Sequence, residues 1–467
     1  MSRSPPRLLA RPFFLAGSIL VAGGCGLGSS PAPVEPAPPA ALTATRAPAF
    51  PLSVSANRRY LVDSRGRPFL IVGDSPQAMT VKLSVRQAAG FLADRRAAGF
   101  NTVWVNLICN KYTGGRRDGR TYDGIPPFTR PRDLSTPNSA YFARVDAMLR
   151  AAARQRFAVL LDPIETGGWL KILHENGSAK AFAYGRYLGR RYRRFRNIIW
   201  MSGNDFQSWR TRSDDALALQ VASGIRAAAP GHLQTVELDY HARHSSSSDD
   251  PRWRSLISLD AAYTYRPTYA QVLDDYLRAD HLPVFMVEAN YEGEFDYTGP
   301  RTLRRQEYWA MLSGASGQLY GNHHTWQFLK DWKTHLDTIG SRQVTYLTNL
   351  FAPRRWFDLV PDTEHRVVVS GNGSYSERGI VGDTDHVAAA STPDGRLLIA
   401  YLPGKQTIGV DMHRLAHGIR AEWYDPTTGM YQPASARERE NSGVREFSSP
   451  GNNRAGEPDW VLVLRAS

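Results

Sequence analysis

The chain has 467 residues, of which 42% are hydrophobic and 22% charged, a balance typical of a globular protein large enough for two or more domains. Its 57 basic residues outnumber its 44 acidic ones, so the net charge is +13, or +10 for the part that begins at residue 25. This excess favours polyanionic partners in general and does not choose among acidic polysaccharide, anionic lipid and nucleic acid. The sequence contains no Gly-x-Ser-x-Gly elbow, phosphate-binding loop or dinucleotide fingerprint, which excludes the serine-hydrolase and nucleotide chemistries that depend on them.

The N-terminus has the pattern of an export signal. Three arginines precede a short apolar run, which predicts a signal peptide over residues 1–24 that is too short to span a membrane. The small residues that lead directly into Cys25 resemble the lipidation site of bacterial lipoproteins, although Ala22 stands where that family usually has leucine. The resemblance implies acylation of Cys25 and, because Gly26 replaces an inner-membrane retention aspartate, an outer-membrane lipoprotein facing the periplasm or the cell surface. The alternative is ordinary cleavage nearby, with Cys25 incidental.

A Pro/Ala-rich stretch over residues 25–49 predicts an extended tether. Beyond it, buried strand patterns alternate with helical patterns. A hairpin turning at residues 64–66 leads into a first strand that ends at residue 74. Further strands are expected at 101–108, 157–162, 198–206, 233–238, 256–265, 283–290 and 318–326, and helices at 84–98, 139–155, 178–195, 213–228, 269–279 and 301–313. Eight strands in this alternation predict an α/β fold, a (β/α)8 TIM barrel over residues 50–360.

The pattern changes after residue 360. Short strands separated by Gly, Pro, Asn and Asp turns are expected at 365–371, 386–391, 396–403, 407–412, 419–424 and 460–465. They predict a small antiparallel β-sandwich domain over residues 361–467.

Two of the barrel strands end in acids. The apolar run 198–201 is cut off by Ser-Gly and followed by Asn204 and Asp205, and the run 283–287 leads into Glu288. The acids are 83 positions apart, nearly three β/α units at roughly 30 residues per unit, so they should face one another across the barrel mouth. We therefore predict that Asp205 and Glu288 form a catalytic carboxylate pair; the alternative is two strand-end acids in structural salt bridges.

The chain from about residue 50 onward resembles the apiosidase-like glycoside hydrolases, including their C-terminal β domain, which is often labelled collagen-binding. The matching stretches are 67–74, 99–103, 199–205, 285–288 and 421–429. The resemblance implies that Asp205 is the acid/base and Glu288 the nucleophile or base of glycoside cleavage. Many relatives have Gly-Asp-Thr-Ala-Trp where this chain has Gly-Asp-Ser-Pro-Gln ending at Gln77, and this departure concerns the sugar subsite.

Other polar and aromatic residues at the expected barrel mouth are candidates for substrate binding; for each, structural hydrogen bonding, capping or packing is the alternative. The candidates are Asp74, Asn106, Asp162, Asn204, His241, Tyr265, His323 and Trp326. His241, His244, His323 and His324 are accompanied by no His-Glu-x-x-His helix or cysteine cluster, so no metal or other cofactor is expected.

The sequence thus favours an exported glycoside hydrolase that acts on a polysaccharide or oligosaccharide. A non-catalytic carbohydrate-binding or scaffold lipoprotein on the same fold is the alternative. A collagen-binding or proteolytic role would rest only on the label of the C-terminal domain. We expect a monomer with a carbohydrate substrate, a membrane contact through its lipid anchor and no nucleic-acid partner.

Overall fold

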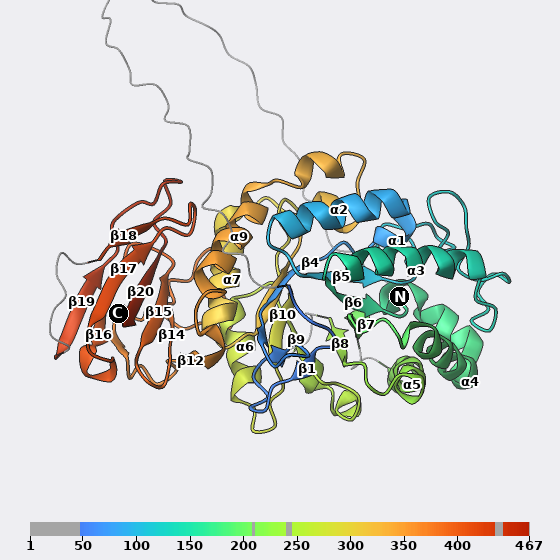
Figure 1. Cartoon of the computed structure of the whole chain (residues 1–467), viewed down its shortest axis with the longest axis horizontal. Coiled ribbons are helices and arrows are strands. Elements are labelled where there is room, and N and C mark those ends of the chain that lie inside the picture. Colours follow the sequence, from blue (N-terminus) through green and yellow to red (C-terminus); the bar gives the residue numbers. More distant parts are fainter. Residues whose placement is uncertain (1–46, 208–210, 240–244, 435–441, 467) are drawn as a thin grey trace, which may run out of the picture. The chain divides into compact units, whose positions relative to one another are not determined.

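The computed structural model describes residues 47–207, 211–239, 245–434 and 442–466, whose arrangement is shown in Figure 1. Cys25, the predicted signal segment, almost all of the tether and His241 lie outside these residues. Within the described part of the chain, no helix is both long and apolar enough to cross a membrane.

Eight parallel strands form one sheet in the order β8-β7-β6-β5-β4-β11-β10-β9, which confirms the predicted barrel. The strands are β4 (Ile71–Asp74), β5 (Thr102–Asn106), β6 (Ala158–Asp162), β7 (Ile198–Phe206), β8 (Gln234–Leu238), β9 (Asp260–Tyr263), β10 (Val284–Glu288) and β11 (Gly317–Tyr320). The helices of this part are α1 (Met79–Lys82), α2 (Val85–Ala97), α3 (Ser139–Arg154), α4 (Thr166–Tyr192), α5 (Arg212–Ala228), α6 (Thr268–Leu277), α7 (Pro300–Leu312), α8 (His323–Trp326) and α9 (Ile339–Phe351).

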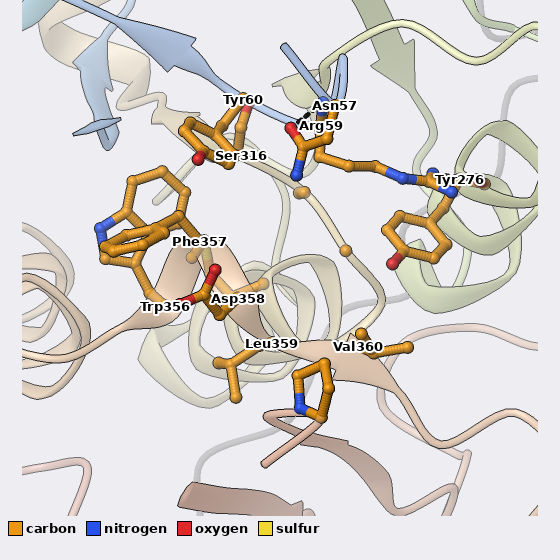
Figure 2. A pocket seen from close by; sticks show the side chains of 14 residues that line it. Asn57, Arg59, Tyr60, Tyr276, Ser316, Trp356, Phe357, Asp358, Leu359 and Val360 are labelled. Atoms are coloured by element: carbon orange, nitrogen blue, oxygen red, sulfur yellow. Dashed lines mark hydrogen bonds between the residues drawn. The ribbon is translucent and has the colours of Figure 1, made fainter. Parts of the chain in front are cut away.

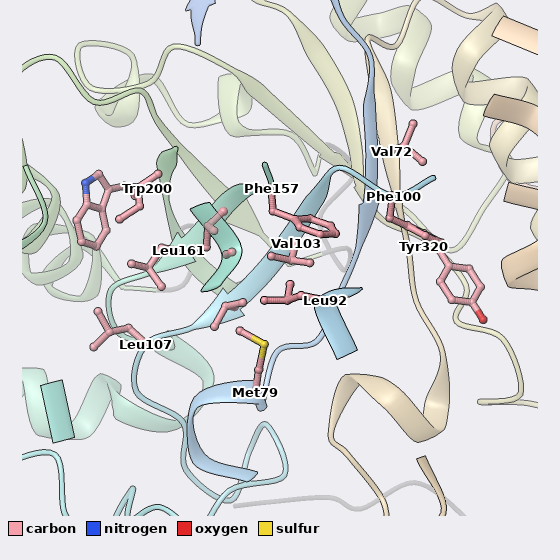
Figure 3. Packing of buried hydrophobic residues seen from close by; sticks show 14 of the residues in the cluster. Val72, Met79, Leu92, Phe100, Val103, Leu107, Phe157, Leu161, Trp200 and Tyr320 are labelled. Carbon is pink, nitrogen blue, oxygen red and sulfur yellow. The ribbon is translucent and has the colours of Figure 1, made fainter. Parts of the chain in front are cut away.

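The barrel strands are buried on both faces. Trp104 and Leu160 belong to the cluster that fills the barrel interior, whereas Val103 and Leu161 pack against the surrounding helices. Figure 3 shows Val103 beside Leu92 of α2. Because successive side chains of a strand point to opposite faces, position along each strand decides whether a residue faces the interior or the helices.

A side chain helps to close the barrel between β8 and β9. Among the described strands, β8 and β9 lie at the two ends of the hydrogen-bonded sheet. The Ser247 hydroxyl donates to the carbonyl of Val236 on β8 (2.5 Å) and accepts from the backbone N–H of Ala261 on β9 (2.9 Å). One hydroxyl therefore satisfies a backbone group on each side of the seam.

A small antiparallel sheet covers the N-terminal ends of the barrel strands. Its strands are β1 (Ser53–Val54), β2 (Leu61–Val62) and β3 (Pro68–Phe69). The Asp63 carboxylate accepts from the backbone N–H groups of Arg65 and Arg67, which holds the predicted turn in place. Leu61 and Phe69 join the interior cluster, so this sheet closes the end of the barrel opposite the mouth.

The C-terminal part consists of two antiparallel sheets, as predicted. The six-stranded sheet has the order β12-β14-β15-β20-β17-β18 and the three-stranded sheet the order β13-β16-β19. Their strands are β12 (Val360–Pro361), β13 (Val368–Ser370), β14 (Ala388–Ser391), β15 (Leu397–Leu402), β16 (Thr407–Asp411), β17 (Ile419–Tyr424), β18 (Tyr431–Pro433), β19 (Val444–Ser448) and β20 (Trp460–Ala466).

Helix α7 joins the barrel to these sheets. The Arg304 guanidinium donates two hydrogen bonds of 2.8 Å to the Asp459 carboxylate, and both side chains are buried. Tyr308 stacks on Tyr401 of β15 with ring centroids 5.0 Å apart. Helix α7 is therefore covered on both sides, which explains why nearly all of its residues are buried.

Some predicted elements differ from the structure. Helix α4 begins at Thr166, twelve residues before the predicted start, because a non-helical Gly177 (φ 70°) joins two helical segments. The predicted strand over 256–265 is only Asp260–Tyr263. After β11 the chain turns into α8 instead of continuing as strand, because the Asn322 side chain caps the N-terminus of that helix. Helix α9 and strands β12, β18 and β19 were not predicted.

Candidate active site

Asp205 lies on a distorted end of β7, the fourth barrel strand. The register between β7 and β8 shifts between Ser202 and Phe206, so β7 bulges at the barrel mouth. Gly203 (φ 126°), Asn204 (φ 73°) and Asp205 (φ 56°) all have positive φ. A non-glycine residue in this region costs about 1–2 kcal/mol, and such strain is found preferentially at functional sites. The backbone is thus distorted at the very residues that carry the predicted acid.

Glu237 of β8 holds this bulge and is a third acid at the site. Its carboxylate accepts from the backbone N–H of Asp205 (2.8 Å), and a Cβ on Gly203 would lie 2.1 Å from its carbonyl oxygen. Burial, followed by the charges of Asp205 and Glu288, raises the pKa of Glu237 well above its ordinary value. The three acids are therefore close enough to influence one another.

Glu288 lies at the end of β10, the seventh strand. A register shift against β9 falls between Met286 and Glu288. The Glu288 carboxylate accepts hydrogen bonds of 2.8 Å from the hydroxyls of Tyr265 and Tyr291. Burial and then the charge of Asp205 raise the pKa of Glu288 to about 8, against the opposing effect of the tyrosine hydrogen bonds. Burial and the nearby negative charge thus both oppose ionisation of Glu288.

A chain of amide side chains connects the two strand ends. Asn106 on β5 donates to Asn204 (2.9 Å), and Asn204 donates to Gln77 (3.5 Å). Gln77 in turn donates to the Tyr291 hydroxyl (3.0 Å), which donates to Glu288. All five side chains are buried. We call Asn106, Asn204, Gln77 and Tyr291 the amide relay; it ties the residue beside Asp205 to the carboxylate of Glu288.

The long loop after β5 contributes Tyr112. Its hydroxyl donates to the Asp205 carboxylate, and 45% of its surface is exposed. The base of this loop is fastened by Glu165, which accepts from the backbone N–H of Asn110 (2.8 Å) and from the hydroxyl of Thr113. Burial raises the pKa of Glu165 to about 7. This loop thus supplies a direct contact to the predicted acid.

Asp74 and Asp162 differ in what surrounds them. Asp74 is fully buried and forms an ion pair of 2.5 Å with Arg95 of α2, so its carboxylate is engaged on the helix side of the sheet and not at the mouth. This placement does not fit the sugar contact expected for Asp74. Asp162 accepts from the backbone N–H of Ile164 (3.1 Å), and its other oxygen has no hydrogen-bond partner among the described residues. Burial raises the pKa of Asp162 well above its ordinary value.

His323 and Trp326 both lie on α8, directly after strand β11. Both side chains are partly buried, and within the described residues neither the His323 Nδ1 nor the Trp326 indole N–H has a hydrogen-bond partner. Burial, followed by the neighbouring His324, lowers the pKa of His323. Both nitrogen atoms are buried, and Asn106, Asn204 and Tyr265 belong to the network around the acids.

Comparison with known proteins identifies the family. The family model described as the apiosidase-like catalytic domain matches residues 55–358, and a model described as the collagen-binding domain of a collagenase matches residues 377–465. The chain belongs to the apiosidase-like family. A search of curated proteins finds no match.

The fold of this apiosidase-like chain is also that of solved glycoside hydrolases. A family 5 glycoside hydrolase from Bacteroides vulgatus superposes with a TM-score of 0.77 at 22% identity, covering 89% of this chain and 93% of that one. A structure described as a glycoside hydrolase gives 0.76 at 22% identity, covering 90% and 97%. At these identities the likeness establishes the fold.

The apiosidase-like resemblance did not reveal several residues of the site: Tyr112, Glu165, Glu237, Tyr291 and Gln77. For Glu237 the sequence does carry a signal, because apolar Val236 and Leu238 alternate with it and both pack against helices. Alternation places Glu237 on the interior face. Gln77, which stands in place of the tryptophan of many relatives, is a buried member of the amide relay.

A cavity of about 160 Å³ lies away from these acids in the fold. Figure 2 shows Tyr60, Trp356 and Phe357 on one side of it and Arg59 stacked on Tyr276 on the other. Its lining includes Ser316, which directly precedes β11, so it lies toward the N-terminal ends of the strands. The cavity therefore lies beside the small sheet β1–β3 that closes the barrel.

Proposed function

We propose that this chain is a glycoside hydrolase that cleaves a glycosidic bond in an oligosaccharide or polysaccharide, with Asp205 and Glu288 as the working carboxylate pair. The observation that supports it best is the electrostatic coupling of these two acids, which are presented by bulges on the fourth and seventh strands. Two acids of unequal protonation are what hydrolysis of an acetal requires.

The proposed reaction requires the proton on Asp205 and an ionised Glu288. Asp205 then donates this proton to the departing glycosidic oxygen while Glu288 acts at the anomeric carbon, either as nucleophile or through an activated water. Tyr112 and the bulged backbone orient the first carboxyl group, and Tyr265 and Tyr291 orient the second. As positive charge develops on the sugar ring, the ionised carboxylate stabilises it.

Exposed aromatic rings near the mouth support a carbohydrate substrate. Phe295 and Tyr297 follow β10, are 51% and 59% exposed, and stack with centroids 5.5 Å apart. The neighbouring Glu294 has its pKa raised by burial and then by the charge of Asp205, so this loop reaches the vicinity of the acid. Flat aromatic faces of this kind suit the apolar faces of sugar rings.

The test is sugar release from a panel of plant and bacterial polysaccharides by the wild type, Asp205→Asn and Glu288→Gln variants, with Glu364→Gln as a control. Glu364 is an exposed acid of the C-terminal part, 65% accessible. Release by the wild type and the control that both site variants abolish would support the proposal. Release that survives both site variants would assign the chemistry to other residues. Binding without release by any protein would favour a non-catalytic carbohydrate-binding lipoprotein.

We also propose that the protein is exported and anchored to the outer membrane through acylated Cys25. The basic, apolar and small-residue segments before Cys25 support this proposal. Labelling of cells with a fatty-acid analogue should mark the wild type and not Cys25→Ser, and the variant should leave the membrane fraction. Equal labelling of both proteins would refute the anchor.

A further inference from the structure

Three side chains on the segment after strand β11 converge outside the carboxylate pair and its amide relay. His324 lies on α8. Asp331 directly precedes the short helix η3 (Trp332–His335), and His335 is the last residue of that helix. One possible ligand atom from each of the three lies within 4.8 Å of the other two.

The geometry of these groups is compact. The imidazole rings of His324 and His335 are stacked almost parallel, with centroids 3.5 Å apart and an angle of 4° between the ring planes. The Asp331 carboxylate lies 2.9 Å from Nδ1 of His324 and 3.9 Å from Nδ1 of His335. A single carboxylate thus faces two imidazoles and cannot neutralise both as cations.

Buried aromatic residues of the same segment anchor its backbone to the barrel. Phe328 and Trp332, which alternate with the three groups along the segment, pack against Phe91 of α2 with ring centroids 5.3 and 6.1 Å away. The side chains of His324, Asp331 and His335 remain 26%, 52% and 30% exposed.

Two backbone hydrogen bonds within the segment add to this support. The N–H of Leu329 donates to the carbonyl of His324 (2.9 Å), and the N–H of Thr334 donates to the carbonyl of Asp331 (3.0 Å). The aromatic anchors and these turns fix the backbone positions of the three residues, and their side chains are partly exposed. Because the lone pairs of parallel stacked rings point side by side, an ion would be bound after rotation of these side chains on the fixed backbone.

We propose that His324, Asp331 and His335 bind a divalent transition-metal ion of the zinc class. Two neutral imidazole nitrogens and one carboxylate oxygen form a donor set that suits zinc, nickel, cobalt or copper, whereas calcium and magnesium prefer oxygen ligands throughout. The remaining coordination positions face solvent and would hold water. The ion would fasten α8 to η3 and thereby steady the segment that begins at the barrel mouth.

Sequence reasoning did not find this site because its three members lie on two short elements and match no common metal motif. The expectation of no metal considered His323 and His324 together and did not include Asp331 or His335. The chain supplies a matched control in His413, whose Nδ1 lies 3.2 Å from Asp411 without a third ligand beside it among the described residues.

The test is isothermal titration of zinc chloride into the chelator-treated protein, purified without a histidine tag, with calcium chloride and magnesium chloride as comparison ions. We expect one saturable zinc site in the wild type and in His413→Ala. Zinc affinity should fall about tenfold or more in His335→Ala and in the conservative variant Asp331→Asn. Calcium and magnesium should produce no comparable binding.

Thermal unfolding provides a readout that does not depend on catalysis. Zinc should raise the Tm of the wild type and of His413→Ala, and the increase should disappear in His335→Ala. Absence of saturable zinc binding in the wild type would overturn the proposal, as would equal zinc affinity in wild type and His335→Ala. Either result would leave an ordinary surface His–Asp ion pair and would not bear on the glycosidase proposal.

Discussion

Asp74 and Glu288 both end a buried barrel strand with a carboxylate, and the structure uses them on different sides of the sheet. Asp74 lies two residues after Val72 and therefore points to the same face of the sheet, toward the helices. The Asp74 carboxylate forms an ion pair with Arg95 of α2. In a regular strand Glu288 would point toward the helices, as Met286 does. The register shift between the two residues instead brings the Glu288 carboxylate to the tyrosines at the mouth. The strand register, and not the residue type, thus decides which acid is structural and which is available for chemistry.

The largest expected effect is that of Glu288→Gln on activity. The substitution keeps the size and the tyrosine hydrogen-bonding partners of the side chain but removes its charge and basicity. We expect kcat/KM on the best substrate of the panel to fall by about 10³-fold. Steady-state kinetics on protein of verified purity measures this loss, and a fall of less than about tenfold would contradict a direct role for Glu288.

The same variant should lose activity but gain thermal stability relative to the wild type as pH rises. The folded-state pKa of Glu288 is about 8, above its ordinary 4.5, so its protonation stabilises the fold fully below 4.5 and progressively less as pH rises through 8. The Tm of the wild type should therefore fall relative to that of Glu288→Gln between those pH values. Parallel Tm curves for the two proteins would show that burial does not shift this group.

Asp74→Asn tests the other side of the comparison. The substitution leaves the buried Arg95 guanidinium without its carboxylate, which we expect to lower the free energy of unfolding by about 3–5 kcal/mol. Activity per folded molecule should remain within about twofold of wild type, since the side chain does not face the mouth. Denaturant unfolding and kinetics on the same samples measure the two quantities.

The control for this variant is Asp123→Asn, which removes an ion pair with Arg144 at partly exposed positions. Surface pairs of this kind contribute about 0–1 kcal/mol. A large loss of activity in Asp74→Asn with little loss of stability would reverse the roles assigned to Asp74 and Glu288.

The sequence predicted the barrel, the C-terminal sheets and the strands that carry both acids, because buried strands leave continuous apolar runs and amphipathic helices leave periodic ones. It could not predict the register shifts before Asp205 and Glu288, since a bulge depends on how two distant strands pair. It could not predict the ion pair of Asp74 either, because it joins β4 to a side chain of α2. Tyr112 and Tyr291 escaped notice because they lie on loops, where no periodicity marks the side chains that turn inward.

Tyr291→Phe sharpens the comparison by removing the hydroxyl that donates to Glu288 and accepts from Gln77. Because the hydrogen bond to Glu288 favours the ionised carboxylate, its loss should raise the pKa of Glu288 further. If Glu288 acts in its ionised form, kcat/KM rises with pH through this pKa, so the rising limb should move to higher pH, with a loss of about tenfold at neutral pH. The pH dependence of kcat/KM measures both effects; Tyr297→Phe, at an exposed hydroxyl near the mouth, is the control and should keep the wild-type limb. An unchanged limb in Tyr291→Phe would mean that the contact has no influence on the carboxylate.

The smallest effect is expected for Gln77→Leu, and it tests whether the amide relay acts as a unit. Leucine nearly fills the glutamine volume but can neither accept from Asn204 nor donate to Tyr291. One such hydrogen bond contributes about 1 kcal/mol, so kcat/KM should fall by about fivefold. Because Gln77 orients the same hydroxyl that binds Glu288, Gln77→Leu should add little to Tyr291→Phe in a double-mutant cycle.

The matched control for that cycle is Gln343→Leu, which changes a buried glutamine that accepts from Arg304 on α7. Its effect should be mainly on stability and should add to that of Tyr291→Phe, because the two share no hydrogen-bond partner. If the effects of Gln77→Leu and Tyr291→Phe on kcat/KM are additive, the contacts of the relay act independently. Non-additivity would instead show how this chain, with glutamine in place of the tryptophan of many relatives, couples the two strand ends that carry its acids.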